Sequence, residues 1–193
     1  MKVRLLPILP LLALCVVTAR GAASEPEKRL ESAVNEVIAV ADRSSGPAAL
    51  AKGIRPVLQK YLSFDAMTRR AIGPGWKQFS PEQQKQATQL FTTLIIRTYS
   101  GKYTPGERPA VDFKPASTPA PGRVEIPTTI LYQGSRYAVS YRLEEADGWR
   151  ITDVVIEGVS LIANYRTQFD AEFKKGGPTA VINALTQSVG TTE

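Results

Sequence analysis

The chain has 193 residues, a length typical of one domain, and its 43% hydrophobic content allows a folded core rather than gross disorder. It carries 24 basic and 18 acidic residues, which gives a formal charge of +6. The sequence has no histidine and one cysteine, Cys15. These counts exclude hydrolases that depend on histidine, zinc sites with histidine ligands and pH switches based on histidine.

The N-terminal segment has the three-part layout of a secretory signal. Lys2 and Arg4 give a positive start, residues 5–17 form an apolar run, and small residues occupy positions 21–23. The apolar run is too short to span a bilayer. We therefore expect export, with signal cleavage after Ala23.

Cleavage would remove residues 1–23 and leave residues 24–193 as a single mature domain. It removes three cations and no acid, so the formal charge falls from +6 to +3. A weakly basic exported protein suits anionic membrane surfaces or acidic partner proteins better than nucleic acid. Cleavage near Gly21, a lipid anchor on Cys15 and a buried N-terminal helix are the alternatives.

Apolar residues recur at helical spacing through the first part of the mature chain. The spacing predicts helices over residues 27–41 and about 48–61, and Pro56 is expected to kink or split the second. Asp65 is expected to cap a short third helix that ends at Gly73.

The strongest helix start lies at residues 80–83, with the sequence Ser-Pro-Glu-Gln. A capping serine, a proline at the first helical position and a glutamine at the capping-box position predict a helix that runs to about Tyr103. Residues 104–122 contain five prolines, and we expect a loop there around a short strand at residues 111–113.

Two alternating segments, residues 124–132 and 135–143, flank a Gln-Gly pair and predict a hairpin with a two-residue turn. In that register one whole face is apolar, and a slip of one residue would destroy this pattern. On the other face Glu125 lies opposite Arg142, a favourable pair of charges. The apolar face pairs Val124 with Leu143, Ile126 with Tyr141, Thr128 with Val139 and Ile130 with Tyr137.

Residues 149–156 predict a third long strand after a loop of two or three residues. A two-residue loop would place Asp153 opposite Arg142. Helical spacing returns at residues 161–169, is broken at residues 176–178, and then resumes. The pattern predicts an α+β fold, in which an antiparallel sheet of about four strands is covered on one face by helices.

Candidate catalytic groups are few. The carboxylates within apolar sequence are Asp65, Asp153 and Glu157, and the sequence has no phosphate-binding glycine motif and no calcium-loop spacing. Asp153 together with Tyr141 could form the acid–base pair of an isomerase, which stays open as an alternative. We otherwise expect no enzymatic activity, no metal site and no cofactor.

Aromatic residues gather on the predicted sheet and its flanking helices. A buried tyrosine needs a hydrogen-bond partner for its hydroxyl, so a wall of tyrosines suits the mouth of a cavity that is apolar inside and polar at its rim. These residues are Tyr99, Tyr103, Tyr132, Tyr137, Tyr141, Trp149, Tyr165 and Phe169.

Two groups of motifs resemble the MlaC family of periplasmic phospholipid-binding proteins, also called the toluene-tolerance family. The first group lies at residues 61–67 (YLSFDAM), 75–76 (GW) and 80–83 (SPEQ). The second lies at residues 149–154 (WRITDV), 157–161 (EGVSL) and 164–169 (NYRTQF). The resemblance covers nearly the whole mature chain, in order, after the expected export signal.

This resemblance implies a nuclear-transport-factor-like α+β cone that encloses an apolar cavity. It also implies a periplasmic carrier that shuttles phospholipid between an outer-membrane lipoprotein–porin complex and an inner-membrane ABC transporter complex, and so maintains outer-membrane lipid asymmetry. One branch of the family is associated with hopanoids, which makes a polycyclic lipid an alternative cargo. We expect a monomer that binds no nucleic acid.

We expect the cavity between the apolar face of the sheet and the helices at residues 81–103 and 160–174. Partner docking is expected to open it, and exchange with bare vesicles is expected to be slow. An isomerase on the same fold and a purely structural adaptor are the other function classes. The expected lining residues are Ile95, Tyr99, Ile126, Ile130, Tyr137, Val139, Tyr141, Leu161 and Tyr165.

Overall fold

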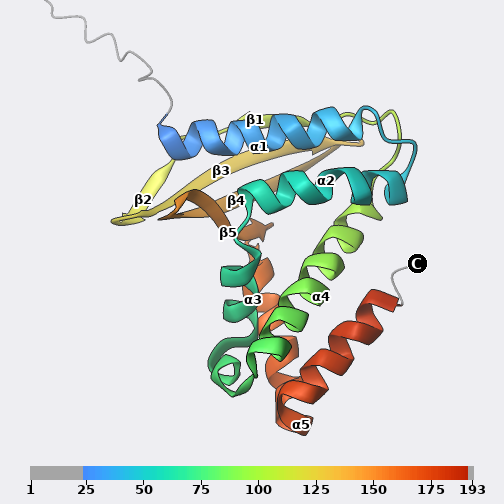
Figure 1. The fold of residues 1–193 in the computed structure, drawn as a ribbon. Helices are drawn as coiled ribbons and strands as arrows, with labels where there is room; N and C mark the ends of the chain where they lie inside the picture. Colours follow the sequence, from blue (N-terminus) through green and yellow to red (C-terminus); the bar gives the residue numbers. More distant parts are fainter. Residues whose placement is uncertain (1–23, 191–193) are drawn as a thin grey trace, which may run out of the picture.

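The computed structural model describes residues 24–190, which form one antiparallel sheet with helices packed around it (Figure 1). The expected signal segment, residues 1–23, lies outside the described residues. The helices are α1 (Glu25–Ala41), α2 (Pro47–Tyr61), α3 (Phe64–Ile72), the 3-10 helix η1 (Gly73–Gln78), α4 (Pro81–Ser100) and α5 (Leu161–Gly190). The strands are β1 (Ala110–Phe113), β2 (Ser117–Ala120), β3 (Arg123–Tyr132), β4 (Ser135–Ala146), β5 (Gly148–Ile156) and β6 (Val159–Ser160). The α+β expectation is confirmed.

The sheet runs in the order β1-β3-β4-β5-β6, and β2 pairs with the other end of β3. It has six strands rather than about four, because β2 forms within the proline-rich segment and β6 adds a two-residue edge. The predicted hairpin register is confirmed, with Val124 opposite Leu143 and Ile130 opposite Tyr137. On the other face Arg142 donates to the Glu125 carboxylate at 3.1 Å.

A bulge sets the pairing of β4 with β5. Glu145 pairs with Trp149, which is the register of a three-residue loop, and Ala146 also pairs with Gly148, whose φ of +79° suits glycine. The register then shifts by one residue at Thr152, and this shift brings Asp153 opposite Arg142. The predicted Arg142–Asp153 pair therefore forms through a bulge and not through a two-residue loop.

The second helix is not split, and the expected cap of the third helix is wrong. Pro56 does not split α2, because the helix is buried on both sides of it, at Leu50 and at Tyr61, and this packing holds the helix together. Asp65 is not the cap of α3. The cap position is Ser63, and Asp65 lies exposed in the first turn, where its negative charge still favours the helix N-terminus.

Glycines mark the C-terminal end of α4 and a break in the middle of α5. The helix α4 ends at Ser100, three residues before the expected Tyr103, with Gly101 in the cap position. The predicted break in the last helix is confirmed, since Gly176 and Gly177 have non-helical backbone angles. The last segment is thus two helices joined at a kink.

Hydrophobic residues pack into two main cores. One core fills the helical half of the molecule, between α3, α4 and α5, and includes the fully buried Phe91 and Val181. The other lies between the sheet and α1, where Leu30 packs with Ile126. Figure 1 shows the sheet with α1 and α2 as one half and α3, α4 and α5 as the other. A small cluster around Ile96 of α4 connects α4 to α2.

Candidate binding pocket

A pocket of about 770 Å³ lies at the β3–β4 turn end of the sheet. Its walls come from the end of α1, the start of α2, the end of α4 and the segment after it, the hairpin, β5–β6 and the start of α5. The sheet side consists of Ile130, Tyr132, Gln133, Tyr137, Val139, Ile156 and Val159. The helix and loop side consists of Val37, Ile38, Ala41, Leu50, Tyr99, Lys102, Tyr103, Glu107, Pro109, Leu161 and Asn164.

The sheet wall is one part of a longer apolar face. Side chains alternate between the two faces of a strand, so residues that pair across strands share a face. This rule groups Ile130, Tyr137, Val139 and Ile156, all of which line the pocket, and we call them the open half. The same face continues into the closed half, where α1 and α2 cover Val124, Ile126, Tyr141, Leu143 and Ile151.

Polar contacts close one side of the pocket. The hydroxyl of Tyr103 donates to the Ala41 carbonyl at 2.5 Å. The backbone N–H of Thr104 donates to the Tyr132 hydroxyl at 2.9 Å, and the side-chain amide of Gln133 donates to the Thr104 hydroxyl at 2.8 Å. These bonds fasten the segment after α4 to both α1 and the β3–β4 hairpin.

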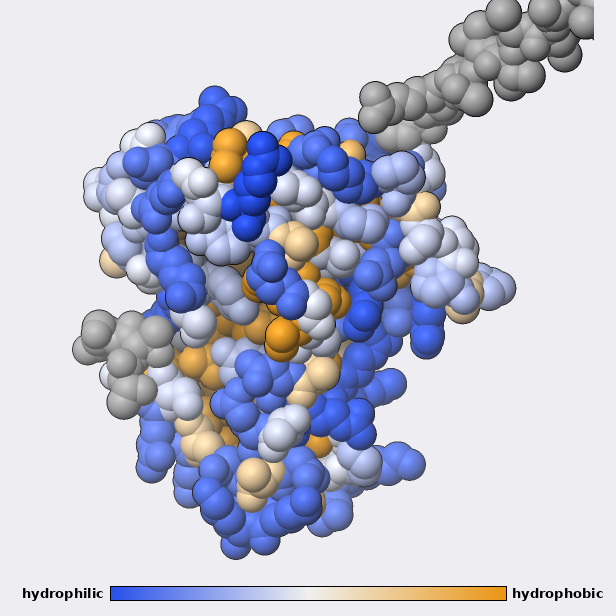
Figure 2. Space-filling model, turned by 180° about the vertical axis from the view of Figure 1, so that it is seen from behind, coloured by the Kyte–Doolittle hydropathy of each residue, from blue (hydrophilic) through white to orange (hydrophobic). Residues whose placement is uncertain are grey.

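Large hydrophobic side chains stay in contact with water at the pocket. Tyr99, Tyr137 and Val159 are 38%, 40% and 60% exposed, and all three line it. Burial, with a smaller contribution from Tyr165, raises the pKa of Tyr99, so its hydroxyl remains neutral. Seen from behind, hydrophobic surface gathers in a hollow of the molecule (Figure 2). Clustered apolar surface of this kind is typical of a site that receives a hydrophobic ligand.

Five of the expected lining residues lie at this pocket: Tyr99, Ile130, Tyr137, Val139 and Leu161. They come from α4, from the two hairpin strands and from the first residue of α5. The pocket also takes in residues of α1 and α2 that the sequence reasoning did not include. The apolar stripe of the first helix was visible in the sequence, but its place over the sheet was not.

The other four expected lining residues pack in the two cores. Ile95 is buried among the helices, and Tyr165 meets the Phe91 ring edge-on, with ring centroids 5.0 Å apart. Ile126 is fully buried under α1, and Tyr141 packs against the same core. Ile95 and Ile126 are buried in these cores, and Tyr141 and Tyr165 are partly buried against them, so none of the four belongs to the pocket lining.

Asp153 and Tyr141 do not share a site. Tyr141 lies on the apolar face, where burial raises its pKa to about 12. Asp153 lies on the opposite face, 3.1 Å from the Arg142 guanidinium. Side chains on opposite faces of a sheet cannot act together on one bond of a substrate. The geometry therefore gives no support to the isomerase alternative.

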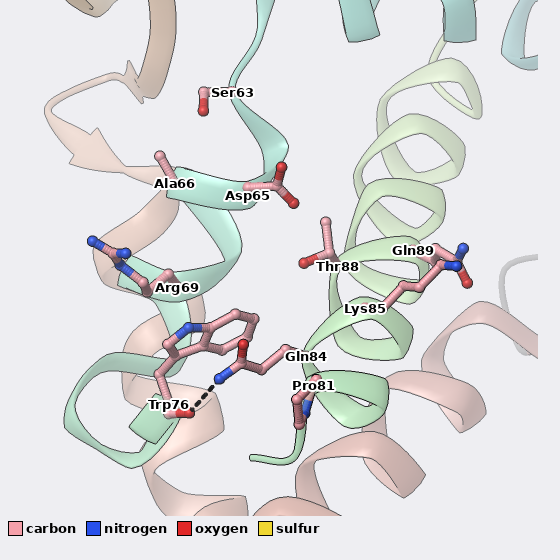
Figure 3. A pocket seen from close by; sticks show the side chains of 10 residues that line it. All are labelled: Ser63, Asp65, Ala66, Arg69, Trp76, Pro81, Gln84, Lys85, Thr88 and Gln89. Atoms are coloured by element: carbon pink, nitrogen blue, oxygen red, sulfur yellow. Dashed lines mark hydrogen bonds between the residues drawn. The ribbon is translucent and has the colours of Figure 1, made fainter. Parts of the chain in front are cut away.

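A second hollow, of about 710 Å³, lies between α3 and α4 (Figure 3). Charged and polar side chains line most of it, among them Asp65, Arg69 and Lys85. The side-chain amide of Gln84 donates to the Trp76 carbonyl at 3.3 Å across its floor. Burying charges against a hydrocarbon chain costs free energy, so this polar groove is a poor match for a hydrophobic ligand.

Between residues 24 and 190, no helix has the length and hydrophobicity needed to cross a membrane. In the same part of the chain, no three acidic or sulfur-bearing side chains come together as metal ligands would.

Comparison with known proteins gives a consistent result. The profile of the MlaC protein family matches residues 30–187, which include the pocket. Among solved structures, the chain is similar to the phospholipid-binding protein from Ralstonia solanacearum in complex with a phospholipid. The two are 26% identical, with a TM-score of 0.81, over 88% of this chain and 99% of that one. No curated protein matches the chain. This protein belongs to the MlaC family.

Proposed function

We propose that this protein binds phospholipid in the pocket at the hairpin and carries it through the periplasm. The observation that carries the proposal is the open half of the sheet face, whose apolar side chains line a pocket of about 770 Å³. A relative of the same fold was solved with a phospholipid bound, which supports this class of ligand. The export signal expected in the sequence supports the periplasmic location.

The energetics explain why such a carrier needs this pocket. At about 0.8 kcal/mol per methylene, an acyl chain of about sixteen carbons opposes transfer into water by roughly 12 kcal/mol. An apolar pocket that encloses the chain removes most of this cost, and the headgroup can remain in water. Binding and release require no nucleophile, metal or nucleotide on the carrier itself.

The proposed route runs between an outer-membrane lipoprotein–porin complex and an inner-membrane ABC transporter complex. Because the pocket shields the chains, exchange with bare vesicles should be slow, and docking to a partner should speed it. The carrier acts as a monomer in this proposal. Rapid complete exchange with protein-free vesicles would contradict the need for a partner.

The proposal is tested by purifying the mature protein from a Gram-negative periplasm, recording its native mass and identifying the extracted lipid by mass spectrometry. A stoichiometric phospholipid supports the proposal. A stoichiometric hopanoid would reassign the cargo to a polycyclic lipid. A protein that carries no lipid and takes up none from phospholipid vesicles would contradict lipid carriage.

Two matched variants test whether the lipid binds in this pocket. Val139→Glu places a charge in the pocket wall and should abolish lipid binding, because an ionised carboxylate is costly next to an acyl chain. Leu131→Glu makes the same kind of change on the same hairpin, but on the opposite face, where Leu131 is 41% exposed and opposite Arg136. This control should keep its lipid, and circular dichroism checks that both variants are folded. Equal lipid content in the two would place the binding site elsewhere.

A further inference from the structure

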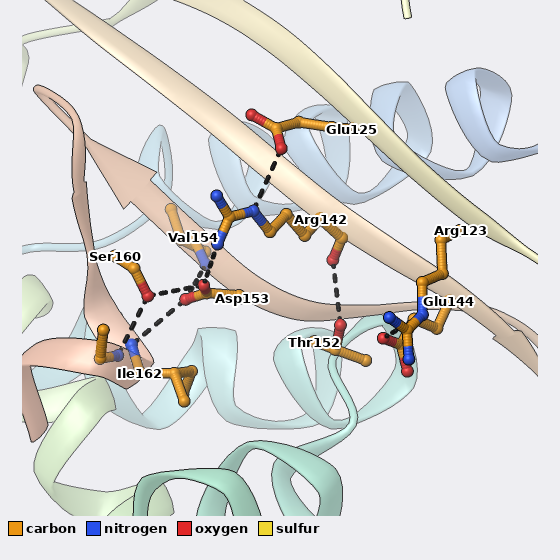
Figure 4. Close-up of polar contacts among 10 residues, drawn as sticks. Arg123, Glu125, Arg142, Glu144, Thr152, Asp153, Val154, Ser160 and Ile162 are labelled. Atoms are coloured by element: carbon orange, nitrogen blue, oxygen red, sulfur yellow. Dashed lines mark hydrogen bonds and ion pairs between the residues drawn. The ribbon is translucent and has the colours of Figure 1, made fainter. Parts of the chain in front are cut away.

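One nearly buried carboxylate joins the sheet to the helix that forms a wall of the pocket. Asp153 of β5 is 6% exposed and accepts four hydrogen bonds (Figure 4). One carboxylate oxygen accepts from the Arg142 guanidinium at 3.1 Å and from the Ser160 hydroxyl at 2.7 Å. The other accepts from the backbone N–H groups of Val154 at 2.9 Å and Ile162 at 3.2 Å. Asp153 thus holds groups on β4, β6 and α5 together.

These bonds act directly on the first turn of α5. Ser160 precedes the helix, and its hydroxyl also accepts from the N–H of Ala163 at 3.0 Å. Leu161 lies between Ser160 and Ile162, so the residues on both sides of it are bonded to the same carboxylate. Leu161 and Asn164 line the pocket. Asp153 therefore contributes to the position of this wall relative to the sheet.

The rest of the connection between β5 and α5 is short. Glu157 and Gly158 both have positive φ, of 49° and 78°, and form the tight turn between β5 and β6. Further along α5, Phe169 and Val181 are buried in the helical core. The first turn of α5 is buried in the same core through Leu161 and Ile162, and β6 joins it to β5. The Asp153 bonds are the polar part of this attachment.

Electrostatic interactions strengthen the bonds between the Asp153 carboxylate and the first turn of α5. A carboxylate that accepts from the first N–H groups of a helix gains from the positive end of the helix dipole, and charge-assisted hydrogen bonds are about twice as strong as neutral ones. The chain of charges continues, since Arg142 also donates to Glu125 on β3. Hydrogen bonding to Glu125, with attraction from both carboxylates, raises the pKa of Arg142 and keeps it cationic.

We propose that Asp153 is a positioning residue of the lipid pocket, which fastens the first turn of α5 to the sheet and thereby sets how long a bound phospholipid stays. This proposal rests on the proposed function. In the mechanism, lipid leaves when the first turn of α5 moves away from the open half of the sheet. A partner that promotes release has to weaken the bonds of Asp153 to Ser160 and Ile162.

The test measures the rate at which a fluorescent phosphatidylethanolamine leaves the loaded mature protein for an excess of phosphatidylcholine vesicles. Asp153→Asn keeps the size of the side chain but removes its charge and one acceptor. It should speed lipid loss at least fivefold. Ser160→Ala removes the hydroxyl bonds to Asp153 and Ala163, should also speed loss, and serves as the test if Asp153→Asn does not fold.

Two controls separate positioning from general stability. Glu144→Gln weakens the ion pairs of Glu144 on the same sheet face, whose partners Arg70 and Arg123 belong to α3 and β3 and not to α5. Val181→Ala destabilises the helical core through a residue that is fully buried and is not part of the pocket lining. Both should release lipid at close to the wild-type rate, under conditions where circular dichroism shows all variants folded.

The outcomes are distinct. Faster loss in Asp153→Asn and Ser160→Ala than in both controls supports the proposal. Equal rates of lipid loss from folded Asp153→Asn and Glu144→Gln would overturn it. So would rates of lipid loss that follow only the loss of stability, as tested with Val181→Ala. If the wild-type protein cannot be loaded with the fluorescent phospholipid at all, the proposed function fails. Loading is measured before the variants are compared, so this failure is distinct from a failure of the role of Asp153.

Discussion

The closed and open halves of the apolar sheet face have the same alternating sequence pattern but different surroundings. In the closed half, Leu30 and Ala33 of α1 lie over the sheet, and Ile126 and Leu143 are almost completely buried. In the open half, the side chains line the pocket, and Tyr137 keeps 40% of its surface exposed. An alternating strand shows which face is apolar, but the helices decide which part of that face becomes core and which part lines an open pocket.

The largest expected difference between the halves is in stability. Leu143→Ala in the closed half should lower the free energy of unfolding by about 3 kcal/mol, because Leu143 is 1% exposed and its removal leaves a cavity. Ile130→Ala in the open half should cost only about 1 kcal/mol in lipid-free protein, since Ile130 already borders the pocket. Urea unfolding of the mature protein measures both. Equal losses would show that the open half is packed as tightly as the closed half.

Gly53 of α2 tests whether close packing of α2 against α1 places the end of α1 at the pocket. A Cβ on Gly53 of α2 would lie 2.6 Å from the Cγ1 atom of Val40 in α1. Gly53→Ala gains up to about 1 kcal/mol of helix propensity but incurs about 1–3 kcal/mol of overpacking, so a net loss near 1 kcal/mol is expected in thermal unfolding.

The same change should also displace the end of α1 and speed lipid loss from the pocket. Gly46→Ser is the matched control, because no atom lies within 4 Å of a Cβ there and serine is a preferred helix cap. Gly46→Ser should be neutral or stabilising. A stabilised Gly53→Ala would contradict the close packing of α1 on α2.

Tyr137 separates stability from ligand binding within the open half. Tyr137→Ala should change the free energy of unfolding of lipid-free protein by less than about 1 kcal/mol, since the side chain is already half in water. It should nevertheless reduce the lipid that copurifies, as measured by mass spectrometry. Unchanged lipid content together with a large loss of stability would assign Tyr137 to the core instead.

The last expected effect appears only at high pH and comes from the closed half. Burial raises the pKa of Tyr141 to about 12, compared with about 10 for an unfolded tyrosine. The folded state therefore holds this proton more tightly, and the associated stability is complete below about pH 10 and is lost as the pH rises toward 12. Tyr141→Phe cannot ionise and should lose less stability than wild type over this interval. Identical alkaline unfolding curves would show that Tyr141 is not buried as described.

The sequence was sufficient for the β3–β4 register because a Gln-Gly turn and two alternating strands left one pairing with a continuous apolar face. It was insufficient for β4–β5, since the bulge at Thr152 has no local signal and changes which residues pair. The same limit applies to the pocket. Ile126 and Ile130 have the same periodicity, but α1 covers only Ile126, and that coverage depends on how α1 and α2 pack together.

We propose that acyl chains contact the open half of the sheet face and not the closed half. Nuclear Overhauser effects between a bound phospholipid and methyl-labelled protein test this most directly, because they report only short distances. Contacts are expected from acyl-chain protons to the methyl groups of Ile130, Val139 and Ile156, and none to those of Ile126 and Leu143. Contacts to the closed-half methyl groups, with none to the open half, would contradict it.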